Sequence, residues 1–375
     1  MELDCDFLVI GAGISGAAAA YELAAHGSVA VLEAESRPGY HSTGRSAALY
    51  TRHFGSPTVR KLSAAGLPFF TNPPAGFADH PLLTPRGGMT VANSEQRGEI
   101  DTLLALGAGD GSIVELTPAQ ALKRAPFLKP EAVAFAAFEE GILDMDVAAI
   151  HQGFLRGLKA RGGQVICDAP IARLERIGRA WHAASDNTLV RAPIAVNAAG
   201  AWADQVGSLA GAAQVGLVPK RRTAIQIDLS NGTDTRSWPA VDEAGYGCYV
   251  KPETGRVMAS PADATPSEPC DAQPEDYDIA VIADWLLRWT TIPVRRIHHR
   301  WAGLRSFVAD ETPVAGFDDQ VPGFFWLCGQ GGYGIMLAPT LGRAAAQLIV
   351  HGSLPADLAD AGVASAELAP ERCRR

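Results

Sequence analysis

Positive charge is in short supply in this chain of 375 residues. Its 32 Lys and Arg residues are outnumbered by 41 Asp and Glu residues, which gives a formal net charge of −9. The only dense basic patch spans residues 295–300, and we interpret it as a solvated or interdomain face. Without a broad basic surface, the sequence predicts no nucleic-acid partner.

Cysteine is also scarce. The six cysteines lie far apart and form no CxxC pair, so they do not make the pattern of a disulfide framework. We expect reduced thiols in a reducing compartment, and hence a cytoplasmic protein. The apolar stretch 7–25 follows acidic residues rather than Lys or Arg and contains Glu22, so we expect neither a signal sequence nor a transmembrane segment.

Several catalytic and metal-binding patterns are missing. There is no GxSxG motif, and no cysteine is paired by motif with a histidine. His298 and His299 are adjacent rather than spaced for one metal ion, so we expect ordinary core or surface histidines and no metal site. What the chain does have is apolar mass, since 47% of its residues are hydrophobic, enough for the cores of two or three domains.

The first 33 residues carry the pattern of a dinucleotide-binding unit. An apolar strand, the turn "GAGISG", an Ala-rich helix and the strand "VAVLE" follow one another, which is typical of a βαβ unit. Gly11 would permit the tight turn, Gly13 would let the backbone approach a pyrophosphate, and Gly16 would let the helix pack closely. Glu33 ends the second strand, where its carboxylate would accept hydrogen bonds from ribose hydroxyls. A purely structural glycine-rich turn is the alternative.

The rest of the chain predicts an α/β fold with a second domain. Helices are expected to begin at the caps Ser56 and Thr117, each followed by proline, and over 147–161, where apolar residues recur at four-residue spacing. Residues 219–262 and 295–309 alternate apolar and polar positions and predict an antiparallel sheet. At the end, a strand, the turn "GQGGYG" and a long helix offer a second helix N-terminus for negative charge.

Many blocks in one order extend over essentially the whole chain, among them "VIGAGISGAAAAYELAAHG", "GYHSTGRSAA", "VNAAGAWAD", "KRRTA", "YVKPETG", "WAGLRSFVAD" and "QGGYGI". Together they resemble the FAD-dependent D-amino acid oxidase and dehydrogenase family, and within it the bacterial D-arginine dehydrogenases. The resemblance implies a Rossmann-like FAD-binding domain from residues 1–80, 146–218 and 305–375. An inserted antiparallel sheet, the substrate-binding domain, would come from residues 81–145 and 219–304.

The resemblance also implies the cofactor site. The small residues of "HSTGRSAAL" would wrap the flavin, with Arg45 supplying fixed positive charge. A cysteine for covalent attachment is missing from the "WAGLRSFVADETP" block, so noncovalent FAD is expected. The residues expected to contact FAD are Gly11, Gly13, Ser15, Gly16, Glu33, Ala34, Ser42, Thr43, Gly44, Arg45, Ser46, Ala47, Ala48, Leu49, Ile171, Gly331, Gly332, Tyr333, Gly334, Ile335 and Met336.

The catalytic residues implied by the resemblance are Arg305, Tyr249 and Arg222. Guanidinium groups and a phenol would hold a substrate carboxylate, so that the Cα hydrogen points at flavin N5. The reaction would be hydride transfer from Cα, giving an imino acid that water hydrolyses to a 2-oxo acid and ammonia. No single side-chain base is expected, and the electron acceptor is unknown.

The substrate pocket is expected to include Leu49, Phe54, Gly88 and Gly332 beside the catalytic residues. The D-arginine enzymes have histidine, tyrosine and an acidic residue at the first three positions. Because a buried guanidinium needs a carboxylate partner and Gly88 provides none, we predict a D-amino acid with a neutral or apolar side chain. Asp242 is a candidate for a replacement acidic contact. Three alternatives stay open: a secondary amine such as sarcosine, a 2-hydroxy acid, and a noncatalytic nucleotide-binding subunit.

Overall fold

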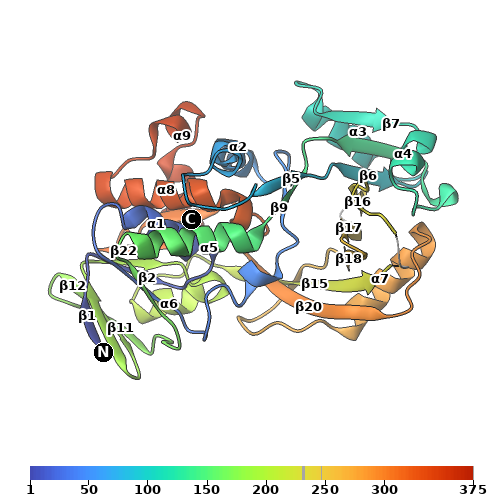
Figure 1. The fold of residues 1–375 in the computed structure, drawn as a ribbon. Helices are drawn as coiled ribbons and strands as arrows, with labels where there is room; N and C mark the ends of the chain where they lie inside the picture. The colour runs from blue at the N-terminus through green and yellow to red at the C-terminus, as the bar shows by residue number, and fades with distance from the viewer. Residues whose placement is uncertain (230–232, 246, 375) are drawn as a thin grey trace.

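The computed structural model describes residues 1–229, 233–245 and 247–374, and it has the predicted α/β fold with two regions side by side (Figure 1). The first region is built on a six-stranded sheet in the order β10-β3-β2-β14-β22-β21. The first five strands are parallel and β21 is antiparallel to β22. In chain order the strands are β2 (Phe7–Ile10), β3 (Val29–Leu32), β10 (Gln164–Ile166), β14 (Ile194–Asn197), β21 (Val314–Phe317) and β22 (Phe324–Cys328).

These strands read as continuous apolar runs because both faces of the sheet are buried. Val9 and Val31 belong to one core, and Leu8 and Ala30 belong to the other. The first core contains the helices α1 (Ile14–Leu23), α2 (Pro57–Thr71), α5 (Val147–Ala160), α8 (Gly334–His351) and α9 (Ala356–Asp360). The second contains α6 (Ala203–Leu209) and a four-stranded sheet of β1 (Glu2–Asp4), β11 (Arg173–Ile177), β12 (Ala180–Ser185) and β13 (Thr188–Ala192).

The second region is a nine-stranded sheet, in the order β19-β15-β18-β17-β16-β6-β8-β7 with β20 also paired to β15. It is antiparallel as predicted, except that β16 and β6 are parallel. Its strands are β6 (Gly88–Ala92), β7 (Ile113–Leu116), β8 (Phe135–Glu139), β15 (Val218–Asp228), β16 (Ala240–Glu243), β17 (Tyr249–Glu253), β18 (Arg256–Ser260), β19 (Thr265–Pro266) and β20 (Ile297–Phe307).

The two faces of this sheet differ in composition. The outer face carries Val241, Val250 and Ile225, which pack with Trp285 and Trp289 in a core of their own. Because side chains alternate along a strand, the polar residues between these positions lie on the inner face. The helices of this region are α3 (Arg97–Gly107), α4 (Pro118–Arg124) and α7 (Asp276–Trp289).

A small sheet and short helices complete the structure. The sheet of β4 (Leu49–Tyr50), β5 (Leu83–Pro85) and β9 (Leu143–Met145) lies at the junction of the two regions (Figure 1). The short 3-10 helices are η1 (Ser42–Arg45), η2 (Pro130–Ala132), η3 (Gly200–Trp202), η4 (Ser365–Glu367) and η5 (Pro370–Arg374). The proposed domain boundaries are not tested by this arrangement and stay a prediction.

The predicted helix starts are confirmed. Ser56 caps α2, accepting a hydrogen bond from the Val59 amide at 3.3 Å, and Thr117 caps α4 in a capping box with Gln120. Helix α5 buries Ile150, Phe154 and Leu158, as the four-residue spacing predicts.

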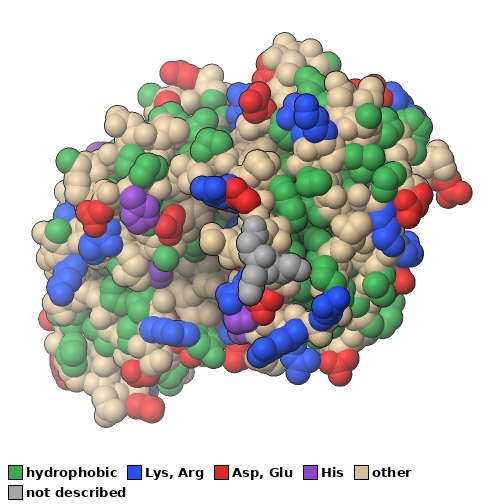
Figure 2. All heavy atoms as spheres, turned by 45° about the vertical axis from the view of Figure 1, so that its right-hand side comes forward, with side chains coloured by type: hydrophobic (Ala, Val, Ile, Leu, Met, Phe, Trp, Pro, Cys, Tyr) green, Lys and Arg blue, Asp and Glu red, His purple; other side chains and the backbone are tan. Residues whose placement is uncertain are grey.

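The surface and the helices add two observations. On the face in Figure 2, basic and acidic side chains are interspersed rather than gathered by sign. No helix in the described part of the chain is both long enough and apolar enough to cross a membrane.

Candidate active site

A cavity of about 460 Å³ lies between the two regions. One side is formed by the carboxyl ends of β2, β3, β14 and β22 with the turns that follow them, and the other by the inner face of the nine-stranded sheet. In open parallel sheets, ligands bind at the carboxyl ends of the strands. The position of the cavity therefore fits a nucleotide that enters at the first turn and extends toward the second region.

The first glycine-rich turn is built by close backbone approach. Gly11 has φ of +98°, and a Cβ on it would lie 2.6 Å from the Ala198 carbonyl oxygen. A Cβ on Gly16 would lie 1.9 Å from the Gly11 carbonyl oxygen. Gly16 thus allows α1 to pack under the turn and does not line the cavity, whereas Gly11 and Gly13 do.

Glu33 is fixed at the end of β3. Its carboxylate accepts hydrogen bonds from the amides of Ala12 at 2.7 Å and Glu35 at 3.0 Å. Each carboxylate oxygen has two lone pairs, so both can still accept a ribose hydroxyl. The geometry therefore suits the role predicted for Glu33.

The segment of η1 is tied to both regions. Thr43 Oγ1 accepts a hydrogen bond from the Ile14 amide at 3.0 Å, at the first turn of α1. The Arg45 guanidinium donates to the carbonyls of Ala302 at 2.9 Å and Ala272 at 3.0 Å, and it pairs with Asp271. Arg45 lines the cavity, but its charge already has a carboxylate partner. It braces the loop against β20, and its predicted role of supplying fixed positive charge to the flavin stays a prediction.

Arg305, Arg222 and Tyr249 come together at the other end of the cavity. Arg222 on β15 lies opposite Gly303 on β20, so Arg222 and Arg305 share the inner face. Tyr249 hydrogen-bonds to Ser260 and Arg222. Among the described residues, Arg305 has no carboxylate or carbonyl partner, because no hydrogen bond or ion pair joins it to one. It is thus free to bind an anion.

The charges at this end perturb one another. Burial alone would raise the pKa of Tyr249, but the positive charges of Arg305 and Arg222 outweigh it and leave the pKa below its ordinary value. Burial, and then the charge of Arg305, lower the pKa of the Arg222 guanidinium. Both shifts indicate a positive potential that a bound carboxylate would relieve.

The second glycine-rich turn lies against Arg305. A Cβ on Gly332 would lie 3.2 Å from Arg305 Nη1, and Gly331 has φ of +51° with Phe307 close behind it. Between them and β22, Gln330 Nε2 is buried and has no hydrogen-bond partner in the described part of the chain. An unpaired buried donor beside small residues fits a planar polar ligand.

Most of the predicted site residues line this cavity. They are Gly11, Gly13, Ser15, Glu33, Ala34, Ser42, Thr43, Arg45, Ser46, Ala47, Ile171, Arg222, Tyr249, Arg305, Gly331, Gly332, Gly334 and Ile335.

Eight predicted residues lie outside the lining: Gly16, Gly44, Ala48, Leu49, Phe54, Gly88, Tyr333 and Met336. Tyr333 and Met336 are buried in the first core, and Phe54 packs edge-on against Tyr333. At Gly88 a Cβ would lie 2.1 Å from Ile142 Cδ1, so Ile142 occupies the space.

Sequence reasoning missed several lining residues, including Trp202, Gln205, Met258 and Gln330. Trp202 and Gln330 lie inside the quoted motifs, so the motif argument could have named them. It could not have named Met258, because its place depends on the register of β18 against β17.

Beyond Tyr249, the inner face carries two acids. Asp242 lies opposite Tyr249 across the strand pair, and it accepts a hydrogen bond from the Thr90 hydroxyl at 3.1 Å. Glu139 lies opposite Gly88 and accepts from the Thr51 hydroxyl at 3.2 Å. Glu139 is only 8% exposed, and burial raises its pKa to about 7. Gly88 itself has no carboxylate, but the neighbouring strands β16 and β8 each carry one, Asp242 and Glu139.

A ligand spanning this cavity from Glu33 to the unpaired Gln330 and Arg305 would be long, polar and planar at one end, which is what a flavin-dependent oxidoreductase must bind. The family model described as DAO, FAD dependent oxidoreductase, matches residues 6–348. The chain belongs to this family, and its cofactor is FAD.

Relatives agree with this assignment. Glycine oxidase of Bacillus licheniformis is 26% identical over 358 residues, covering 92% of this chain and 93% of that protein. Human mitochondrial sarcosine dehydrogenase is 26% identical over 292 residues, covering 72% of this chain and 31% of that protein. The crystal structure of L-proline dehydrogenase from P. horikoshii superposes with a TM-score of 0.84 at 20% identity, covering 100% of this chain and 99% of that one.

Proposed function

We propose that the protein catalyses the FAD-dependent oxidative deamination of a D-amino acid to a 2-oxo acid and ammonia. The observation that carries this proposal is Arg305, a guanidinium without a protein acceptor in the described residues, beside Tyr249 and the Gly332 turn. An unpaired cation at the end of a cavity is costly unless the ligand brings the opposite charge. A substrate carboxylate supplies that charge.

The chain's own residues would bind and orient. Arg305 presents a planar fork of donors that matches a carboxylate, and Tyr249 adds a third donor. Fixing the carboxylate fixes Cα, and such positioning contributes up to about 7–11 kcal/mol in favourable cases. Bound FAD would supply the redox chemistry by accepting the hydride from Cα. Water would then hydrolyse the resulting imino acid.

No side-chain base is part of the proposal. The carboxylates and histidine that line the cavity in the described residues are Glu33, Glu35 and His41. Glu33 is held by backbone amides, and His41 hydrogen-bonds to Glu35 at 2.8 Å. A substrate held at Arg305 by its carboxylate, with its amine neutral, would not need a side-chain base in order to transfer its Cα hydride.

The test is anaerobic mixing of the FAD-bound protein with D-amino acids, L-amino acids, sarcosine, glycine and 2-hydroxy acids. We expect a D-amino acid to bleach the flavin absorbance fastest. Reduction by sarcosine or a 2-hydroxy acid alone would overturn the D-amino acid proposal but keep the family chemistry. Repeating the reaction in air separates an oxidase from a dehydrogenase, because only an oxidase re-oxidises rapidly.

For the side chain, we propose a neutral or apolar group. Ile142 fills the space at Gly88, where the D-arginine dehydrogenases that the sequence resembles carry an acid. A contact of the substrate side chain with the carboxylate of Asp242 or Glu139 would instead favour a basic side chain. A kcat/KM for D-arginine above that for D-leucine would contradict the proposal.

A secondary amine is the second candidate substrate. It is favoured by the relatives, whose names specify sarcosine and glycine as substrates. Sarcosine and glycine also carry a carboxylate, so the same Arg305 contact would serve them.

Two further proposals concern the cofactor and the domains. We propose noncovalent FAD, and acid precipitation would then release the yellow chromophore into the supernatant. We also propose that residues 1–80, 146–218 and 305–375 form the FAD-binding domain.

A further inference from the structure

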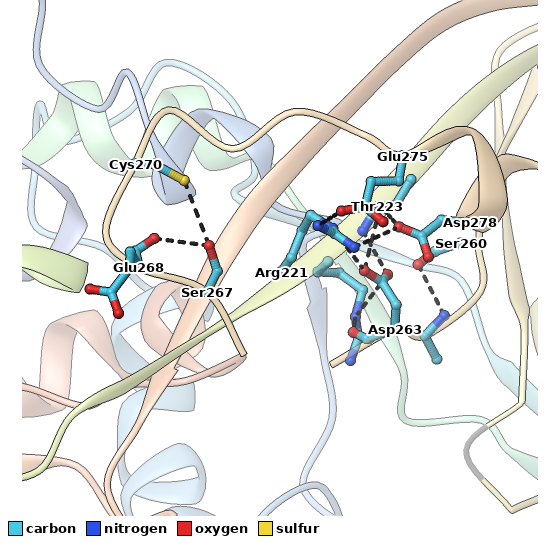
Figure 3. Close-up of polar contacts among 11 residues, drawn as sticks. Arg221, Thr223, Ser260, Asp263, Ser267, Glu268, Cys270, Glu275 and Asp278 are labelled. Carbon is cyan, nitrogen blue, oxygen red and sulfur yellow. Dashed lines mark hydrogen bonds and ion pairs between the residues drawn. The ribbon is translucent and has the colours of Figure 1, made fainter. Parts of the chain in front are cut away.

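A network of charged side chains is attached to β15 next to Arg222 in the sequence (Figure 3). Its centre is Arg221, the preceding residue on β15, whose side chain points away from the cavity face. Arg221 lies 3.4 Å from Asp278 and 3.9 Å from Asp263, and it also pairs with the exposed Glu275. The Asp263 and Asp278 side chains are only 8% and 7% exposed. Carboxylates buried to this degree are held by specific partners.

The Asp263 carboxylate takes the place of a strand carbonyl beside β15, where the pairing with β18 has ended. Strand β18 pairs with β15 as far as Ala259 opposite Ile225, and the chain then turns through Ala262, which has φ of +55°. The Asp263 carboxylate accepts the Thr223 amide at 2.7 Å, where a strand carbonyl would otherwise do so. The side chain therefore fastens this turn to β15.

The fastened turn holds Arg222. The Asp263 carbonyl accepts a hydrogen bond from Arg222 Nε at 2.5 Å, and Asp263 Oδ1 lies 3.8 Å from the same nitrogen. Arg222 thus has one anchored nitrogen and a nearby negative charge. Arg305, its neighbour on the inner face, has neither in the described residues.

We propose that Asp263 is a positioning residue that holds Arg222 against Tyr249 and offsets its charge, leaving Arg305 as the guanidinium that pairs with the substrate carboxylate. This inference rests on the proposed function. Two guanidiniums face a cavity that would receive one carboxylate, so one of them needs a counter-charge from the protein. Asp263 meets that need for Arg222.

The test compares Asp263→Ala, Asp263→Asn and the control Glu275→Gln. Glutamine at 275 changes the exposed partner of Arg221 and leaves Arg222 untouched. Anaerobic flavin reduction by D-leucine, D-alanine, sarcosine and glycine gives a limiting rate and an apparent Kd for each protein. FAD content and thermal melting report folding.

We expect Asp263→Ala to raise the apparent Kd about 10–100-fold, the range for losing a hydrogen bond to a charged group, with a limiting rate within about threefold. Asp263→Asn keeps an acceptor for the Thr223 amide but removes the negative charge near Arg222, so its apparent Kd should lie between those of Asp263→Ala and the wild type. Glu275→Gln matches the wild type. A merely structural role would lower melting and FAD content together, without a selective change in Kd.

If no amine reduces the wild-type flavin, the proposed function is contradicted, but the positioning role of Asp263 is still testable. The test is then a crystal structure of FAD-bound Asp263→Ala. We expect the Arg222 guanidinium to leave Tyr249. Arg222 in its wild-type place would overturn the inference, as would an unchanged Kd for a substrate that reduces both proteins.

Discussion

The two ends of the cavity differ in the groups that line them. At the nucleotide end, glycines and backbone amides form the wall, and the charged groups are satisfied within the protein: Glu33 by amides and Arg45 by Asp271. At the far end, side chains of the nine-stranded sheet form the wall, and Arg305 has no protein acceptor in the described residues. One end is thus complete before a ligand binds, whereas the other needs a ligand's charge.

The largest expected effect separates the two ends. Arg305→Ala removes the unpaired guanidinium, so substrate binding should weaken by about 3–5 kcal/mol. The kcat/KM for flavin reduction should then fall at least about a hundredfold. FAD content should not change, because the nucleotide end is untouched. Stopped-flow reduction and the absorbance ratio of flavin to protein measure the two quantities. A variant that loses FAD in proportion to activity would contradict the comparison.

The inner face should also make stability depend on pH. Burial raises the pKa of Glu139 from 4.5 to about 7, so its protonated form is favoured in the folded state. Its contribution to stability is present below about pH 4.5 and is lost as pH rises toward 7, amounting to at most about 3 kcal/mol. Glu139→Gln should flatten the unfolding free energy between pH 5 and 8, as measured by denaturant titration. The exposed neighbour Glu140 provides the control Glu140→Gln, which should follow the wild-type curve.

Substitution of one glycine, Gly11, should disrupt FAD binding at the nucleotide end. Gly11→Ala forces a Cβ against the Ala198 carbonyl at a backbone angle that only glycine adopts easily, which should cost about 2–3 kcal/mol. We expect a protein with markedly reduced FAD content. Gly178→Ala is a matched control: it has φ of +63° but nothing within 4 Å of its Cβ, and it lies in the turn between β11 and β12. Equal FAD loss in both variants would show that backbone angle alone is responsible.

The smallest effect concerns the side chain of the substrate. Asp242 is outside the cavity lining, but it lies across the strand pair from the lining residue Tyr249 and has a hydroxyl as its partner, so it could accept a donor from a substrate side chain that extends past Tyr249. Asp242→Asn should lower kcat/KM for D-arginine about tenfold, roughly 1.4 kcal/mol, and leave D-leucine within about twofold. An equal change for both substrates would show that Asp242 does not contact the substrate side chain.

The same contrast explains what the sequence could predict. Turns that bind through backbone need glycine at fixed spacing, so Gly11, Gly13 and Gly332 were visible as motifs. Residues of the sheet face, such as Met258 and Asp263, meet the site only through strand pairing between distant segments. Leu49, Phe54 and Gly88 were expected in the pocket by resemblance, yet they lie outside the cavity lining. At Gly88 the reason is that the Ile142 side chain occupies the space.

The position of β22 has a consequence for biogenesis. This strand, residues 324–328, lies between β14 and β21, and its partner β14 pairs on the other side with β2 at the start of the chain. A ribosome must therefore deliver nearly the whole polypeptide before the central sheet can close, and such distant pairings form slowly. Until then one edge of β14 has no partner and the glycine-rich turn after β22 is missing from the cavity wall, so capture of the yellow cofactor belongs to the final stage of synthesis.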